Sequence, residues 1–158
     1  EWALGSGATH LFKGAAGDAL QNVRDLTNGR MLDVVFDVTG HPAVLAQAVQ
    51  LVGKMGKVIL LGDTAKPSSQ VLGPGVVSDS KSILGVHVSN YPREYTPFNP
   101  WTFQEMSSLF FHYLKHGKMN VNSLVSQVVS PVKAAEIYPR VLENKEAVMG
   151  VLFDWSDI

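Results

Sequence analysis

The chain has 158 residues, of which 46% are apolar and 17% are charged, a composition typical of one folded domain and not of a disordered chain. Thirteen basic and fourteen acidic residues leave a net charge of −1, and no run of lysines or arginines could follow a phosphate backbone, so nucleic acid is not an expected partner. The sequence has no cysteine, no secretory leader pattern and no apolar run of membrane-span length, so we expect a cytoplasmic location and no contact with a membrane.

The N-terminal part begins with the pattern of a helix end, residues 1–7, in which apolar residues lead into two glycines. Residues 8–12 predict a short strand. Asp18 is suited to cap a helix over Ala19–Asn28, and Gly29 is suited to end it.

A second strand is predicted over residues 33–38, where three consecutive apolar residues, 34–36, are typical of a parallel strand that helices cover on both faces. Pro42 opens the next helix and Gly56 is predicted to end it. Residues 57–61 form a third apolar strand, so the order is βαβαβ with short connections and parallel strands.

The later part begins with a surface loop rich in proline, glycine and serine, and contains a rigid aromatic segment that we expect to pack against the body or a partner. Thr102 and Glu105 have capping-box spacing, which predicts a helix that ends at Gly117. The predicted segments are a loop at 63–77, a strand at 82–89, the aromatic segment at 91–101, a strand at 124–129, a helix from Ser130-Pro131 and a strand at 148–155.

Two predicted strands each stop at a glycine, Gly40 and Gly62, as in a nucleotide-binding sheet. No G-x-G-x-x-G stands upstream of them in this sequence, so these residues would supply one wall of a dinucleotide crevice. The fold class predicted is therefore α/β: a partial Rossmann-like, doubly wound, mainly parallel sheet with helices on both faces, whose first strands and glycine-rich turn are missing.

The order GATHLF, LTNG, DVVFDVTGHP, GKVILLG, ILGVHVS, HGKMNVNSLVS, VSPVKAAEIY and MGVLFDW resembles the zinc-type medium-chain dehydrogenase/reductase superfamily, which includes alcohol, sorbitol and threonine dehydrogenases. The resemblance covers almost the whole chain. It implies one partial cofactor-binding domain over residues 1–158 with a C-terminal tail, in a parent about twice as long whose N-terminal domain carries the catalytic zinc. In the family's strand order, two absent strands would separate residues 9–12 from the later strands, so local rearrangement or pairing between molecules is expected.

The resemblance also implies cofactor-binding positions at three strand ends. The first end would lie beside the adenine ribose, and backbone groups of the other two would hold the nicotinamide carboxamide, which offers donors and an acceptor. The implied residues are Val38, Thr39, Gly40 and His41 at the first end, Leu61, Gly62 and Asp63 at the second, and Val86, His87 and Val88 at the third.

Each of these positions also has a purely structural interpretation. Gly40 lets backbone approach a ligand, or simply makes the turn into the next helix. His41 could stack on adenine, or be an exposed loop histidine. Val86 and Val88 could pack in a core or a subunit interface, and His87 could do either.

The remaining candidate residues do not match known catalytic or metal-binding motifs. His112 and His116 are four residues apart, but the intervening residues lack the glutamate of H-E-x-x-H, so a solvated helix end is the better interpretation. Asp37 within the second strand is expected to accept hydrogen bonds from its neighbours. Many relatives place an arginine or lysine near the C-terminus for the pyrophosphate, whereas this chain has Met149. No catalytic residue and no metal ligand is assigned.

Two functional hypotheses follow. The first is the cofactor-binding portion of an alcohol-dehydrogenase-like enzyme, which uses NAD or NADP, an alcohol or carbonyl substrate, and zinc bound only by the rest of the parent; this chain alone is expected to be inactive. The second is a non-catalytic association module, in which the strand at 82–89 pairs with its copy in a homo-oligomer.

Overall fold

The computed structural model describes residues 2–143 and 148–156. It forms two compact units, one of Phe12–Tyr91 and one that combines Glu1–Leu11 with Pro92–Ile158. None of the helices described is both long and apolar enough to cross a bilayer. Glu1, predicted to belong to a helix end, lies outside the described residues.

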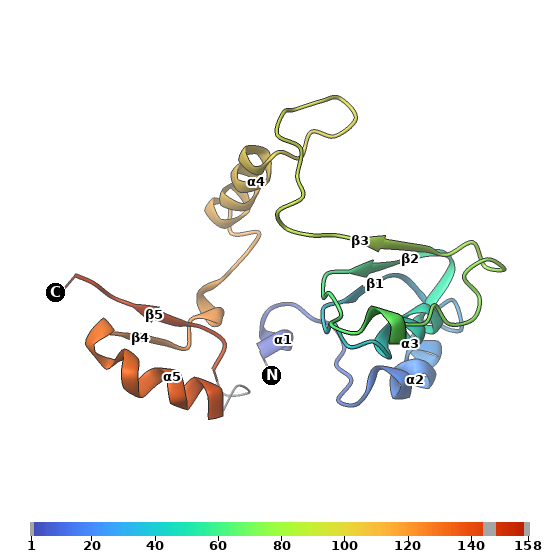
Figure 1. Ribbon diagram of the computed structural model, residues 1–158, viewed down its shortest axis with the longest axis horizontal. Coiled ribbons are helices and arrows are strands. Elements are labelled where there is room, and N and C mark those ends of the chain that lie inside the picture. Colours follow the sequence, from blue (N-terminus) through green and yellow to red (C-terminus); the bar gives the residue numbers. More distant parts are fainter. Residues whose placement is uncertain (1, 144–147, 157–158) are drawn as a thin grey trace. The chain divides into compact units, whose positions relative to one another are not determined.

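The Phe12–Tyr91 unit is a three-stranded parallel sheet with helices between its strands (Figure 1). The strand order is β1-β2-β3, and the register pairs Val35 with Val58 and Ile59 with Leu84. The predicted α/β class with parallel strands is thereby confirmed. The elements in chain order are η1 (Ala16–Ala19), α2 (Leu20–Leu26), β1 (Leu32–Asp37), α3 (Val44–Leu51), β2 (Val52–Leu60), η2 (Pro67–Ser69) and β3 (Ser82–Gly85).

The core of this unit is the contact between α3 and the sheet. Leu45, Ala48 and Val49 project from α3 onto Val52 and Val58 of β2, and all five side chains are buried. Helices were predicted on both faces of the sheet, but within the described residues only the face that packs against α3 is covered. On the opposite face of β1, Val34 and Phe36 are 43% and 62% exposed.

The boundary between α3 and β2 differs from the prediction. The helix ends at Leu51, where Val52 turns to an extended conformation, and not at Gly56. The reason is packing: Val52 is buried in the core, whereas Met55, which the predicted helix would include, is 79% exposed with φ +59°. Gly56 lies inside β2, where a side chain would collide with Val52 and with the carbonyl oxygen of Asp33.

The first helix forms with a different start. Asp18 lies within η1 and makes no capping hydrogen bond, so the predicted cap is wrong, and the α-helix spans Leu20–Leu26. The end at Gly29 is confirmed: φ is +80° and its N–H donates to the carbonyl of Arg24 at 2.7 Å.

One predicted strand is absent and three are shorter than expected. The strands predicted over 124–129 and 148–155 are shortened to Gln127–Val129 and Val151–Phe153. Residues 8–12 form no strand, because a strand requires a hydrogen-bonded neighbour and no described segment pairs with them. β3 covers only Ser82–Gly85 of the predicted 82–89, although the N–H of Val86 still donates to the carbonyl of Leu60 at 2.9 Å.

The other unit contains a smaller parallel pair, β4 and β5, with α5 between them in sequence (Figure 1). Thr102 caps α4 by accepting a hydrogen bond from the N–H of Glu105 at 3.3 Å, and the left-handed Gly117 follows the helix, as predicted. The elements are α1 (Trp2–Gly5), α4 (Phe103–Lys115), η3 (Asn122–Leu124), β4 (Gln127–Val129), η4 (Pro131–Lys133), α5 (Ala134–Glu143) and β5 (Val151–Phe153).

Burial in this unit is lower than the sequence predicted. On α5, Ile137 is buried, whereas the apolar or aromatic side chains of Tyr138 and Leu142 are exposed. In the aromatic segment, Thr96 and Asn99 bond to each other and present Phe98 to solvent at 99% exposure. The segment therefore does not pack as a core element within the described residues.

Replacing Val58 by alanine should destabilise the Phe12–Tyr91 unit by about 2 kcal/mol, because two fully buried methyl groups are removed and a cavity is left. Urea unfolding followed by far-UV circular dichroism measures the change. Val77→Ala is the matched control, since it removes the same atoms from a side chain that is 92% exposed. Equal unfolding midpoints for the two variants would contradict the assignment of this core.

Candidate functional site

A cavity of about 380 Å³ opens at the carboxyl ends of β2 and β3. This is the edge at which open parallel sheets bind ligands, and the volume lies in the range of small-molecule sites. The cavity lies wholly within the Phe12–Tyr91 unit. Its walls are the segment Leu60–Thr64, the segment Gly85–His87, Gln70 and Asn90.

Five of the ten residues predicted from sequence line this cavity: Leu61, Gly62, Asp63, Val86 and His87. Val88 does not line it and is 84% exposed. Five lining residues were missed: Leu60, Thr64, Gln70, Gly85 and Asn90. Leu60, Thr64 and Gly85 adjoin the predicted segments, and extending each segment by one residue would have included them. Nothing in the sequence distinguishes Gln70 or Asn90.

The remaining predicted residues, Val38 to His41, form the turn after β1 and contact the turn after β2. A Cβ on Gly62 would collide with the backbone of Val38 and Gly40, and a Cβ on Gly40 would lie 2.5 Å from the carbonyl oxygen of Asp63. Gly40 also has φ +64°. Both glycines are thus required by the contact between the two turns, which brings the first predicted segment directly beside the cavity wall.

Asp37, at the end of β1, accepts hydrogen bonds from both turns at this edge. Its carbonyl accepts the N–H groups of Leu61 at 2.9 Å and Gly62 at 3.1 Å. Its buried carboxylate accepts the N–H and the hydroxyl of Thr39 at 2.9 and 2.7 Å, as the sequence predicted for this acid. Asp37 therefore fixes the two turns that carry the candidate residues.

The backbone donors of the site divide into used and available groups. The N–H groups of Leu61, Gly62 and Val86 are engaged within the fold. The N–H groups of Asp63, Thr64 and His87 donate to none of the residues that the structure describes. The donors available to a ligand amide at the cavity are therefore among these three groups.

Two histidines flank the site with their rings held in the same way. The Nδ1 atom of His41 accepts from the N–H of Ala43 at 3.3 Å, and that of His87 accepts from the N–H of Ser89 at 3.2 Å. Because Nδ1 is the acceptor, each neutral ring carries its proton on Nε2. Both residues are exposed and present Nε2 as a donor.

The position near the C-terminus where the resemblance would place a cation for the pyrophosphate holds an uncharged residue, as the sequence showed. Met149 occupies that position, is 52% exposed, and donates its N–H to the hydroxyl of Ser126 at 2.9 Å. Glu146, three residues before Met149, lies outside the described residues.

Comparison with known proteins identifies the family. A family model described as zinc-binding dehydrogenase matches residues 1–104. Sorbitol dehydrogenase of Bacillus subtilis is 24% identical over 148 residues, which are 92% of this chain and 37% of that protein. Erythritol/L-threitol dehydrogenase of Mycolicibacterium smegmatis is 31% identical over 87 residues, 54% of this chain and 24% of that protein. The chain therefore spans well under half the length of these relatives.

Solved structures show the same fold. An alcohol dehydrogenase from Escherichia coli CFT073, complexed with NADH, matches 98% of this chain and 41% of its own with a TM-score of 0.73 at 16% identity. Benzyl alcohol dehydrogenase of Acinetobacter calcoaceticus matches 94% of this chain and 38% of its own with a TM-score of 0.69 at 19% identity.

Replacing Gly62 by alanine should destabilise the Phe12–Tyr91 unit by about 2 kcal/mol, because the added methyl group overpacks two backbone turns. Gly85→Ala is the matched control, since a Cβ there meets nothing within 4 Å. Chemical denaturation of both variants measures the difference. If Gly85→Ala were as destabilising as Gly62→Ala, the close approach of the two turns would not be the cause.

Proposed function

The chain belongs to the zinc-binding dehydrogenase family, and on that basis we propose that it is the cofactor-binding portion of a zinc-dependent, alcohol-dehydrogenase-like oxidoreductase. The parent enzyme would transfer hydride between an alcohol or carbonyl substrate and NAD or NADP. The observation that carries the proposal is the cavity at the carboxyl ends of β2 and β3, which five of the predicted cofactor-binding residues line.

We assign the nicotinamide carboxamide to this cavity. An amide needs both donors and acceptors, and the free N–H groups of Asp63 and His87 meet the first need from two neighbouring strand ends. The bound nicotinamide ring would supply the hydride acceptor, while these residues hold and orient its amide. Apolar Leu61 and Val86 would exclude water from the ring face.

The turn Val38–His41 is assigned to the adenine ribose side. Its contact with the turn after β2 supports this, because the two turns then form one continuous edge along which an extended dinucleotide would lie. The Nε2 donor of His41 is suited to a ribose hydroxyl or to an adenine nitrogen. The residues 1–158 would act as one partial domain of the parent.

Zinc does not fit the residues of this chain. The sequence contains no cysteine, and the part of the chain that the structure describes gathers no group of three histidine or acidic side chains able to hold a metal ion. We therefore assign the metal and the acid–base groups to the rest of the parent. By itself the chain should bind cofactor weakly and catalyse nothing.

Titration of the isolated chain with NADH, followed by amide NMR, should show saturable shifts at Leu61, Asp63 and His87 with a dissociation constant in the millimolar range. Weak affinity is expected because no glycine-rich turn is present in these residues to hold the pyrophosphate. His87→Ala should change the shifts at Asp63, whereas His112→Ala, an exposed histidine on α4, should not.

Binding tighter than millimolar would contradict the half-site proposal, as would shifts confined to other parts of the chain. Reduction of NAD by the isolated chain in the presence of sorbitol or threonine would contradict the assignment of catalysis to the rest of the parent.

A second candidate function, association of copies through a sheet edge, is favoured by the position of β3. β3 lies at the edge of the sheet, so its outer row of backbone donors and acceptors pairs with no strand among the described residues. Leu84 on this strand is 44% exposed. A homo-oligomer would cover both features.

Size-exclusion chromatography with light scattering should then show a dimer that dissociates on dilution. Because the N–H of Val86 points to β2, the N–H of Gly85 points outward, and Gly85→Pro should weaken the dimer while leaving the far-UV spectrum unchanged. A monomer at every concentration would overturn this candidate.

A further inference from the structure

A larger cavity, of about 550 Å³, lies at the opposite edge of the sheet, where β1 and β2 begin. It lies within the Phe12–Tyr91 unit and is formed by the end of α2, the start of β1, the start of β2 and the loop before β3. The proposed cofactor function does not use this edge.

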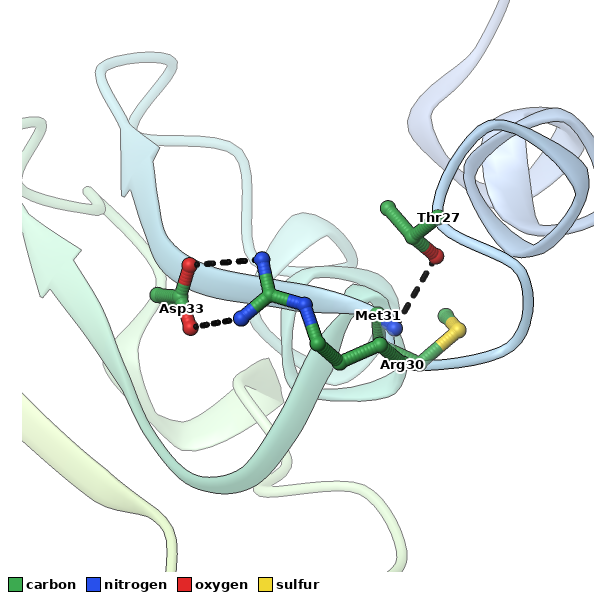
Figure 2. Close-up of polar contacts among 4 residues, drawn as sticks. All are labelled: Thr27, Arg30, Met31 and Asp33. Atoms are coloured by element: carbon green, nitrogen blue, oxygen red, sulfur yellow. Dashed lines mark hydrogen bonds and ion pairs between the residues drawn. The ribbon is translucent and has the colours of Figure 1, made fainter.

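The side chains around this cavity carry excess positive charge. Four cations and two carboxylates line it: Arg24, Arg30, Lys54, Lys81, Asp33 and Asp79. Both carboxylates are already neutralised, because Asp33 pairs with Arg30 at 2.8 and 3.1 Å (Figure 2) and Asp79 pairs with Lys81 at 3.3 Å. Arg24 and Lys54 pair with no acid among the described residues, which leaves two uncompensated charges.

The helix ends at this edge cancel only part of that excess. Two helices, α2 and α3, point their carboxyl ends here, and each contributes about half a negative charge. One carbonyl near the end of each helix is engaged internally, since the N–H of Gly29 donates to the carbonyl of Arg24 and the ammonium of Lys81 donates to the carbonyl of Val49 at 3.0 Å. A net positive charge remains, carried by Arg24 and Lys54, which form no ion pair among the described residues.

The backbone of this edge is also held in unusual conformations. All four non-glycine residues with left-handed φ in the described chain lie in or beside the segments that line the cavity: Asn28, Met31, Met55 and Ser80. Such conformations cluster at ligand sites. They are fixed by specific bonds, in which the hydroxyl of Thr27 accepts the N–H of Met31 at 3.0 Å (Figure 2) and the carbonyl of Asp79 accepts that of Met55 at 2.8 Å.

We propose that this cavity is a binding site for a small molecule that carries a phosphate group. A phosphate ester carries close to two negative charges near neutral pH, which matches the two unpaired cations, Arg24 and Lys54. Arg30, oriented by Asp33, supplies a third donor at the rim. The volume fits a small metabolite.

The site is tested on the 158-residue chain with inorganic phosphate as the probe, at constant ionic strength maintained with chloride. Amide NMR should show saturable shifts at Gly29, Met31 and Gly53, and none at Gly85 near the other edge. Acetate, with a single charge, should bind more weakly. The absence of saturation would overturn the site, and equal binding of acetate would overturn the assignment to phosphate.

Arg24→Gln and Lys54→Gln should each weaken phosphate binding about tenfold, because each removes one charge-assisted contact. Both side chains are exposed and unpaired, so the fold should be retained. Arg140→Gln and Lys133→Gln are the matched controls, since they remove the same charges from exposed positions in the other unit. If the controls weakened binding as much, the effect would be one of net charge and the proposal would fail. The NADH titration is followed at Leu61, Asp63 and His87, which do not line this cavity. A negative result with phosphate would therefore leave the cofactor proposal to be tested separately.

Discussion

The carboxyl edge of the sheet depends on one close contact, that between the turn after β1 and the turn after β2. Gly40 and Gly62 let the two backbones approach within a distance that no side chain would allow, and the carbonyl of Asp37 joins them through two N–H groups. The glycines are therefore structural. They serve binding indirectly, because the contact aligns two strand ends along one ligand edge and leaves the N–H groups of Asp63 and His87 free.

Local signals in the sequence predicted the elements whose ends are determined by local chemistry. Gly29 and Gly117 follow helices in the left-handed conformation, and Thr102 caps α4, because each depends only on backbone geometry and a neighbouring donor. The end of α3 was mispredicted at Gly56 because tertiary packing decides it: burial of Val52 in the core requires an extended residue before the glycine is reached. Residues 8–12 have strand composition, but pairing depends on a neighbour that the local sequence does not encode.

The candidate site shows the same division. The end of β2 could be predicted, since Gly62 follows a recognisable apolar run. The end of β3 could not, because the strand stops at Gly85 and not at the predicted residue 89. The resemblance assigns both Gly62 and His87 to the cofactor, and both line the cavity. Which backbone N–H groups remain free could not be predicted from the sequence, because that depends on the register between strands. The N–H groups of Leu61 and Gly62 donate to the carbonyl of Asp37, and that of Val86 donates to the carbonyl of Leu60. Gln70 reaches the cavity from a loop whose path no periodicity determines.

The two edges of the sheet differ in the kind of recognition they offer. The carboxyl edge presents backbone amides and the imidazole rings of His41 and His87. These groups suit an uncharged amide and sugar hydroxyls. The amino edge presents unpaired cations around strained turns, which suits an anion. In a parallel sheet the helix carboxyl ends gather at the amino edge, so an anion there must be held by side chains, and Arg24 and Lys54 meet that requirement without disturbing the capped helix ends. Recognition of amide and of phosphate can therefore occur at separate edges of one sheet, each by the groups its geometry leaves free.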